Sequence, residues 1–195
     1  MKVICITGKI GSGKSVALGI LEKKGARVLD ADKISRDVTL PGSTTLSEIA
    51  DTFGKEYITN EGALDRKKLG LLVFADRKKL DILENILYNS IKREILDEIA
   101  KAENDGIDIL AIEAINPFDT RFINIFDEIW VIYCDEDTQM DRVRQRDKLE
   151  TGEIENIISS QKSFEEYKEI ATHLIANNGN IIELENNINK ILGEG

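Results

Sequence analysis

The chain has 195 residues, 42% of them hydrophobic and 32% charged, which suits one or at most two domains with a substantial core. Its 26 Lys and Arg against 36 Asp and Glu give a net charge of −10, which argues against binding duplex nucleic acid or lying on an anionic membrane. No stretch approaches the roughly 20 apolar residues of a membrane span. Cys5 and Cys134 lie in apolar runs, which are typical of buried, reduced thiols. Together these features lead us to expect a cytoplasmic protein.

Short, nearly continuous apolar runs alternate with helical segments along the chain. Runs of this kind predict strands that are buried on both faces of a sheet. They cover residues 3–7, 27–29, 109–112 and 129–133, while 173–176 and 181–184 are candidates for a fifth, short strand and a partner. Because helical segments separate the runs, the order predicts an α/β fold with a parallel five-stranded sheet, right-handed crossovers and flanking helices.

The stretch between Asp32 and Ile107 breaks this alternation, because no run in it predicts a strand. Thr45 and Glu48 have the spacing of a capping box, and Asp76 is placed to cap the helix that follows it. That helix is predicted by apolar residues three and four apart, namely Leu80, Leu83, Leu87, Ile91, Ile95 and Ile99. We expect one domain over residues 1–195, with a core of about 1–37 and 105–195 and a helical insertion over about 38–104.

A second insertion is charged and weakly apolar, over residues 147–160. Ser163 and Glu166 have the spacing of a new capping box after it. With the end of the preceding helix, this segment is predicted to form a short lid over about 142–163.

Residues 8–15, GKIGSGKS, match the phosphate-binding pattern G-x-x-x-x-G-K-[ST], after an apolar strand and at the start of a helix. Glycines let successive backbone N–H groups point inward at phosphate oxygens, and the helix adds its N-terminal partial charge. In this pattern Lys14 reaches the β- and γ-phosphates and the Ser15 hydroxyl ligates Mg²⁺. The loop therefore predicts an ATP site made of Gly8, Gly11, Ser12, Gly13, Lys14, Ser15 and Val16.

A phosphate loop alone does not separate a kinase from a switch or a motor. The second predicted strand ends in an Asp30-Ala31-Asp32 run with Arg36 one helical turn later, and Glu113 closes the third strand. Ligands of open α/β sheets bind beyond the carboxyl ends of strands, so we expect these side chains to face the phosphate loop. Asp32 there can accept a proton from an attacking hydroxyl, Arg36 can hold an anionic acceptor, and Glu113 can position metal or water. The alternatives are a helix cap for the paired acids and an ordinary strand-end acid for Glu113.

Arg142 and Arg146 are four residues apart on a predicted helix and share one of its faces. Arginines at the edge of a lid can clamp a phosphoryl group in transfer as the lid closes. The alternative is a solvated basic face that pairs with Asp141 and Asp147.

Taken together, these residues resemble the dephospho-CoA kinase family over most of the chain. The likeness rests on the opening residues 6–15, on 28–32 with Arg36 and Pro41-Gly42, on Phe53-Gly54, 62–66 and 73–76, and on Gln139, Arg142, Arg146-Asp147, Gln161 and 176–179. The resemblance implies a P-loop kinase that transfers the γ-phosphoryl group of ATP, with Mg²⁺, to the 3′-hydroxyl of dephospho-CoA. Asp32 would be the catalytic base, and the helical insertion would help hold the acceptor.

The resemblance also implies which residues meet the substrates. Lys14 would act beside Asp32 in the chemistry, and Asp32, Arg36 and Glu113 would face the acceptor. Arg142 and Arg146 would lie near the ATP phosphates or adenine, and residues 177–179, Asn178 among them, near the base.

Two positions depart from the family pattern. Tyr88-Asn89 stands where the family usually has a His-Pro pair, and Glu113 is followed by Ala-Ile-Asn-Pro, with Ile115 to Pro117 in place of Pro-Leu-Leu. Both lie on the presumed acceptor side. Two alternatives therefore stand beside the main prediction, namely a kinase for another small acceptor such as a nucleoside monophosphate, and an ATP-binding regulatory paralogue without transfer.

Overall fold

The computed structural model describes residues 1–113 and 120–193, and the chain divides into two compact units. The first unit consists of Met1–Leu29 and Ala102–Gly195, and the second of Asp30–Lys101. No helix in the described ranges combines the length and the apolar content that a bilayer crossing requires.

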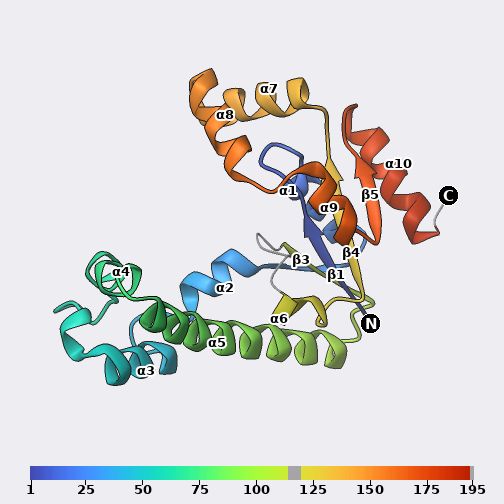
Figure 1. The fold of residues 1–195 in the computed structure, drawn as a ribbon. Helices are drawn as coiled ribbons and strands as arrows, with labels where there is room; N and C mark the ends of the chain where they lie inside the picture. The colour runs from blue at the N-terminus through green and yellow to red at the C-terminus, as the bar shows by residue number, and fades with distance from the viewer. Residues whose placement is uncertain (114–119, 194–195) are drawn as a thin grey trace. The chain divides into compact units, whose positions relative to one another are not determined.

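A five-stranded parallel sheet in the order β2-β3-β1-β4-β5 forms the first unit (Figure 1). In chain order the strands are β1 (Lys2–Thr7), β2 (Arg27–Asp30), β3 (Ile109–Glu113), β4 (Glu128–Tyr133) and β5 (His173–Ala176). The central strand β1 pairs with β3 and β4, so that Cys5 lies opposite both Ile112 and Ile129. The α/β class and the five strands predicted from the apolar runs are confirmed.

The proposed partner strand over residues 181–184 is wrong, because these residues begin helix α10 (Ile181–Leu192). Asn180 caps that helix, its side chain accepting hydrogen bonds from the N–H groups of Ile182 and Glu183. Leu184 and Ile188 are the buried positions, four residues apart. A four-residue apolar run is too short to show that spacing, so it fits a strand and a helix equally well.

Helices cover both faces of the sheet because alternate side chains of its strands point to opposite faces. α1 (Lys14–Lys23) and α10 pack on the face that carries Ile4, Ile6 and Trp130. α6 (Thr120–Ile123) and α9 (Phe164–Ile170) lie on the face of Cys5 and Val131. The sheet core therefore fixes where β1 ends and α1 begins, which is where the phosphate loop lies.

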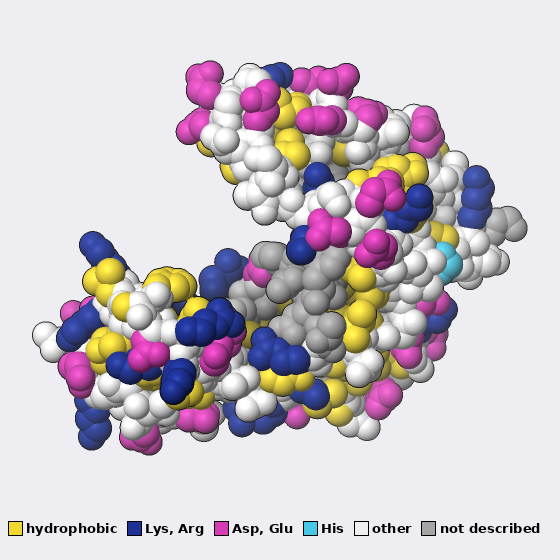
Figure 2. All heavy atoms as spheres, viewed as in Figure 1, with side chains coloured by type: hydrophobic (Ala, Val, Ile, Leu, Met, Phe, Trp, Pro, Cys, Tyr) yellow, Lys and Arg dark blue, Asp and Glu magenta, His cyan; other side chains and the backbone are white. Residues whose placement is uncertain are grey.

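The segment predicted to form a lid, residues 142–163, contains the end of α7 (Glu136–Asp147) and α8 (Thr151–Ser160). Val143, Ile154 and Ile158 form its buried core. Ser163 and Glu166 form the predicted capping box at the start of α9, which is confirmed. Figure 2 shows Asp and Glu side chains gathered over α7 and α8.

The second unit is helical, as predicted, and contains α2 (Ala31–Asp37), α3 (Thr44–Phe53), η1 (Lys55–Tyr57), α4 (Arg66–Phe74) and most of α5 (Arg77–Asn104). Its core is formed by Ile49, Leu69, Val73 and Ile86. The predicted cap at Asp76 is confirmed, since its carboxylate accepts hydrogen bonds from the N–H groups of Lys78 and Lys79.

The capping box predicted at Thr45 and Glu48 is wrong. Ser43 caps α3, its hydroxyl accepting a hydrogen bond from the N–H of Leu46 at 3.1 Å. Thr45 is buried inside the helix instead and donates its hydroxyl proton to Ser90 of α5 at 2.8 Å. Three adjacent hydroxyl residues can each cap a helix, and the turn before Ser43 decides which one does.

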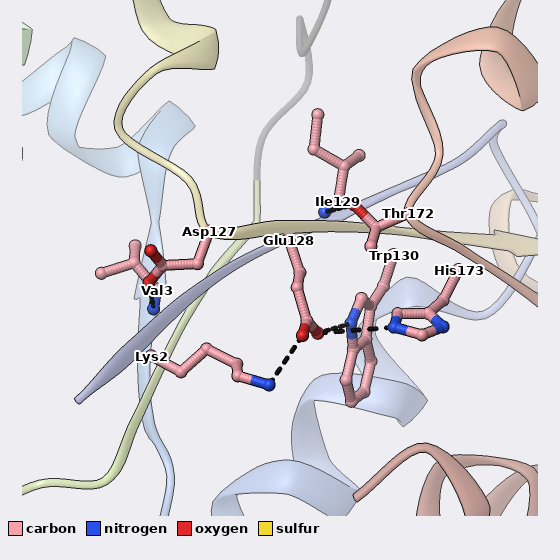
Figure 3. A network of polar contacts seen from close by, with 8 residues as sticks. All are labelled: Lys2, Val3, Asp127, Glu128, Ile129, Trp130, Thr172 and His173. Atoms are coloured by element: carbon pink, nitrogen blue, oxygen red, sulfur yellow. Dashed lines mark hydrogen bonds and ion pairs between the residues drawn. The ribbon is translucent and has the colours of Figure 1, made fainter.

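A polar network joins three strands at the amino end of the sheet, away from the strand ends that carry the phosphate loop (Figure 3). The Glu128 carboxylate accepts hydrogen bonds from Lys2 Nζ at 2.6 Å and Trp130 Nε1 at 2.7 Å, and His173 Nε2 lies 3.7 Å from it. Burial alone would raise the pKa of Glu128, but the hydrogen bonds and charges of Lys2, Trp130 and His173 outweigh it, so the pKa is lowered.

We expect Glu128→Gln to lower the free energy of unfolding by about 1 kcal/mol at pH 7, because it removes the ionised acceptor of this network. A lowered folded-state pKa stabilises the fold above the ordinary value of 4.5, and this contribution is lost as pH falls through the folded pKa. The difference between the variant and the parent should therefore shrink as pH is lowered below 4.5 in urea titrations. Glu185→Gln, at an exposed position of α10, is the control. A difference that persists unchanged at pH 3 would contradict the assignment.

Candidate active site

The phosphate loop joins β1 to α1 and depends on three glycines with positive φ, namely Gly8 (143°), Gly11 (74°) and Gly13 (98°). A Cβ at Gly8 would collide with the carbonyl oxygen of Ile132, and one at Gly13 with the side-chain amide of Asn177. Glycine is therefore required by both the backbone conformation and the space around it. Gly13 is also the N-cap of α1, so the loop ends at the positive end of a ten-residue helix.

A cavity of about 160 Å³ opens over this loop. Its volume suits phosphate groups rather than a whole nucleotide. Lys14 lies at its edge and donates hydrogen bonds to the carbonyl oxygens of Gly8 (3.0 Å) and Lys9 (3.4 Å), which holds its ammonium across the loop. The lining brings together seven of the predicted site residues from three segments of the chain, namely Gly11, Gly13, Lys14, Ser15, Glu113, Arg142 and Arg146.

The two lid arginines differ in their partners. Arg146 forms a two-pronged ion pair with Asp147, both N···O distances being 2.8 Å, and Arg144 rather than Arg142 pairs with Asp141 at 2.9 Å. The predicted alternative of a paired basic face thus applies to Arg146. Nη1 of Arg142 is buried and has no hydrogen-bond partner among the described residues. A buried guanidinium N–H is costly to leave unpaired, so Arg142 suits an anionic ligand at this cavity.

Cys134 was expected to be a buried core thiol, but it is only half-buried and its Sγ lies 3.8 Å from the carbonyl oxygen of Gly11. Burial is the main cause that raises its pKa, so the thiol stays protonated. Cys5 is fully buried as expected, and burial raises its pKa to about 12. An apolar run does not reveal that Cys134 follows the last residue of β4 and meets the phosphate loop there.

A larger cavity of about 410 Å³ borders the same loop at Lys9 and Ser12. Asn178 lines this cavity rather than the smaller one, and its side-chain oxygen accepts a hydrogen bond from the N–H of Asp135 at 2.8 Å. The volume falls in the range of small-molecule sites. Its wall includes the aromatic rings of Tyr133, Phe164 and Tyr167, and the centroids of the first two are 5.0 Å apart.

Asn177, the residue before Asn178, contacts the phosphate loop instead of lining the larger cavity. It is buried, and its Nδ2 donates a hydrogen bond to the carbonyl oxygen of Ser12 at 2.8 Å. The end of β5 is thereby tied to the phosphate loop. Sequence reasoning placed this residue near the base and gave no sign of the contact, because 165 residues separate the two partners.

Asp32 and Arg36 both lie on α2 of the second unit. Asp30 is the residue that caps α2, since its carboxylate accepts hydrogen bonds from the N–H groups of Asp32 (2.9 Å) and Lys33 (3.0 Å). The capping role considered for the paired acids therefore belongs to Asp30, and Asp32 occupies the first turn of the helix. Arg36 Nη2 lies 4.0 Å from Asp30 Oδ2. That Asp32 and Arg36 face the phosphate loop stays a prediction.

The two departures from the family pattern fall in different places. Tyr88 and Asn89 lie on α5, where the ammonium of Lys92 lies 5.6 Å from the centroid of the Tyr88 ring. The departure over Ile115 to Pro117 lies outside the described residues.

Metal binding by the protein alone has little support at this site. Within residues 1–113 and 120–193, no three His, Cys, Asp or Glu side chains gather closely enough to hold a metal ion. The oxygen donors at the smaller cavity are the Ser15 hydroxyl and the Glu113 carboxylate. One or two protein oxygens combined with phosphate oxygens and water is the usual donor set of a nucleotide-borne Mg²⁺, so these residues fit that ion.

Comparison with known sequences shows the family of this chain. The sequence model of the family described as dephospho-CoA kinase matches residues 2–183. Among curated proteins, the dephospho-CoA kinase of Carboxydothermus hydrogenoformans is 35% identical over 98% of this chain and 93% of its own length. That of Geobacter sulfurreducens is 36% identical over 98% of this chain and 97% of its own length.

Solved structures give the same result. A Thermus thermophilus protein has a TM-score of 0.78 at 27% identity, over 99% of this chain and 97% of that chain. Dephospho-CoA kinase from Campylobacter jejuni has a TM-score of 0.69 at 26% identity, over 100% of this chain and 97% of that chain. Shikimate kinase from Acinetobacter baumannii, at 17% identity and a TM-score of 0.53 over 99% and 94% of the two chains, shares the fold alone. The predicted P-loop kinase fold is confirmed.

Proposed function

We propose that this chain, which belongs to the dephospho-CoA kinase family, makes coenzyme A from ATP and dephospho-CoA. The observation that carries the proposal is the smaller cavity, where Lys14 and Ser15 meet Arg142 of a distant segment over a glycine-rich loop. Such a cavity suits the phosphate groups of a nucleotide. In the reaction the bond between the γ-phosphorus and its bridging oxygen breaks to release ADP, and a bond from that phosphorus to the 3′-oxygen of the acceptor ribose forms.

The acceptor hydroxyl must lose its proton during this transfer. We assign Asp32 as the base that takes it, because a carboxylate is an acceptor of the right strength and no covalent intermediate is required. Asp30 supports the assignment, since by capping α2 it fixes the helix turn that carries Asp32. Arg36 on the next turn would hold an anionic group of the acceptor.

The phosphate groups of ATP need positive charge that is already in position. Lys14 supplies a point charge at the loop, and Arg142 supplies a guanidinium whose buried Nη1 has no hydrogen-bond partner within residues 1–113 and 120–193. Charges held in advance in a partly dry site stabilise the γ-phosphoryl group in transfer with little reorganisation. Arg146 would join them after exchanging Asp147 for the phosphates. Asn178 would meet the nucleoside part in the larger cavity.

Ser15 and Glu113 would hold a Mg²⁺ ion that arrives with ATP. Such an ion neutralises charge on the phosphate oxygens. Ser15 is well placed for this role because it is on the first turn of α1, directly after Lys14. Glu113 ends β3 beside the same cavity.

The helical second unit is proposed to hold the acceptor. α4 exposes Leu71 (73%) and Phe74 (80%), which is unusual for large apolar side chains that lie one turn apart on one helix. Figure 2 shows Lys and Arg side chains among apolar ones over this unit. Dephospho-CoA combines a long, weakly polar arm with a pyrophosphate, so an apolar surface with basic residues beside it matches its chemistry.

We expect the double variant Leu71→Ser, Phe74→Ser to raise KM for dephospho-CoA about tenfold. Serine at these positions removes part of the apolar contact between α4 and the bound acceptor. KM for ATP should stay unchanged. Initial rates of ADP production at varied acceptor concentration measure both values. The control is Ile182→Ser, which removes another exposed apolar side chain (64% exposed) from α10 of the first unit. An unchanged acceptor KM would exclude this surface from the acceptor site.

The activity itself is tested by ADP production from Mg-ATP with dephospho-CoA, beside nucleoside monophosphates and a sample without acceptor. We expect acceptor-dependent ADP release with dephospho-CoA alone. Release only with nucleotides would support the alternative small-molecule kinase. ATP binding without release for any acceptor would support the regulatory alternative.

A further inference from the structure

Both backbone polar groups of Ile10, in the middle of the phosphate loop, are bound by glutamine side chains. The N–H of Ile10 donates to Gln161 Oε1 at 2.9 Å, and Gln139 Nε2 donates to the carbonyl oxygen of Ile10 at 2.6 Å. Backbone chemistry fixes the orientation of both amides, because an N–H can only donate and a carbonyl can only accept. Gln161 must therefore present its oxygen and Gln139 its nitrogen.

The two glutamines lie near the two ends of the lid segment. Gln139 lies on α7 just before the segment begins, and Gln161 is the C-cap residue of α8, where the segment ends. The Ile10 side chain packs against the lid core of Val143, Ile154 and Ile158, so the loop and the lid share one apolar cluster. Figure 1 shows α8 close to the loop between β1 and α1.

We propose that Gln139 and Gln161 form a clamp through which the lid segment holds the phosphate loop in its nucleotide-binding conformation. Gln161 lines neither cavity, and Gln139 borders the larger cavity but not the smaller one. Both glutamines contact the phosphate loop through Ile10, so we treat them as positioning residues. The loop needs such support because glycines at 8, 11 and 13 leave its backbone free to leave the required conformation. Binding to a loop that is already ordered avoids the cost of ordering it. The inference rests on the proposed function in one respect, that ATP binds at this loop.

The clamp predicts that a Gln→Glu substitution weakens ATP binding more at position 139 than at position 161. Gln161→Glu keeps an oxygen acceptor for the N–H of Ile10. Gln139→Glu removes the donor and places a carboxylate against a carbonyl oxygen in a buried position. Both variants add the same negative charge next to Ile10, but only Gln139 also borders the larger cavity. The uncharged variant Gln139→Met therefore separates loss of the donor from repulsion of ATP. We expect Gln139→Glu to bind ATP at least about tenfold more weakly than Gln161→Glu at pH 8, by calorimetry.

The pH dependence separates positioning from a general structural role. A protonated carboxyl can donate to the Ile10 carbonyl, so the ATP-binding defect of Gln139→Glu should shrink as pH falls from 8 to about 5.5. Gln139→Met offers no donor at any pH, and its defect relative to the parent should stay constant. Gln145→Glu, an exposed position on the same helix, should bind like the parent throughout. Thermal unfolding of each variant shows that the fold is intact.

Equal ATP affinities for Gln139→Glu and Gln161→Glu, or a Gln139→Glu defect that does not change with pH, would overturn the clamp. If Gln139→Glu fails to fold, Gln139→Met and Gln161→Met test the same contacts, and parent-like affinity in both would overturn it as well. Failure of the proposed function looks different, because the parent chain itself would then bind no ATP, or Lys14→Ala would bind it as well as the parent.

Discussion

Asp32→Asn is expected to lower kcat for phosphoryl transfer to dephospho-CoA by about 10³-fold, because the amide cannot take the proton of the attacking hydroxyl. The affinity for ATP should remain within about twofold, since the phosphate loop, the lid arginines and Ser15 belong to the other unit. Single-turnover ADP formation with saturating substrates measures the chemical step, and calorimetric titration with ATP measures binding. A pure loss of kcat is the signature of an interaction needed only in the transition state.

The control for this variant is Asp30→Asn, which makes the same change in charge two residues away. Asparagine caps a helix about as well as aspartate, so α2 should keep its cap and the enzyme most of its rate. A large loss in Asp30→Asn together with a small one in Asp32→Asn would move the base to Asp30. Retained turnover in both variants would remove the D-x-D pair from the chemistry.

The phosphate loop and the sheet could be predicted because each is encoded over a short stretch of the sequence. Residues 8–15 hold three glycines whose positive φ no other residue adopts easily, so the pattern implies the conformation. Strands buried on both faces leave continuous apolar runs, and β4 contains four buried residues in six. The run at 181–184 was assigned wrongly because four residues cover only about one helical turn, which is too short to show a repeat.

The support of the phosphate loop could not be predicted in this way. Gln139, Gln161 and Asn177 reach the loop from segments at least 129 residues away, and nothing in their local sequence indicates the contact. Such contacts depend on how α7, α8 and β5 pack on the sheet, which single-sequence patterns do not specify. The cap of α3 failed for a related reason, because Ser43, Thr44 and Thr45 are chemically equivalent caps and only the preceding turn selects Ser43.

Lys14→Ala is expected to lower kcat/KM for ATP by about 10³-fold, because it removes the point charge that meets the β- and γ-phosphates at the loop. Lys14→Arg should recover little of this loss. Its guanidinium is larger than an ammonium and would have to fit a cavity of about 160 Å³ that two arginines already line. Lys23→Ala, at the other end of α1, is the control with the same loss of charge.

The split between substrates identifies what Lys14 does. Because Lys14 lies in the first unit with the phosphate cavity, its loss should act on ATP, while KM for dephospho-CoA should change by less than about threefold. Initial rates over a grid of both substrate concentrations measure both parameters. A defect confined to the acceptor would place Lys14 on the acceptor side, and an unchanged rate would show that the loop takes no part in transfer. A loss in kcat/KM for ATP that exceeds the loss in ATP affinity would mean that Lys14 stabilises the γ-phosphoryl group more strongly in transfer than in the bound nucleotide.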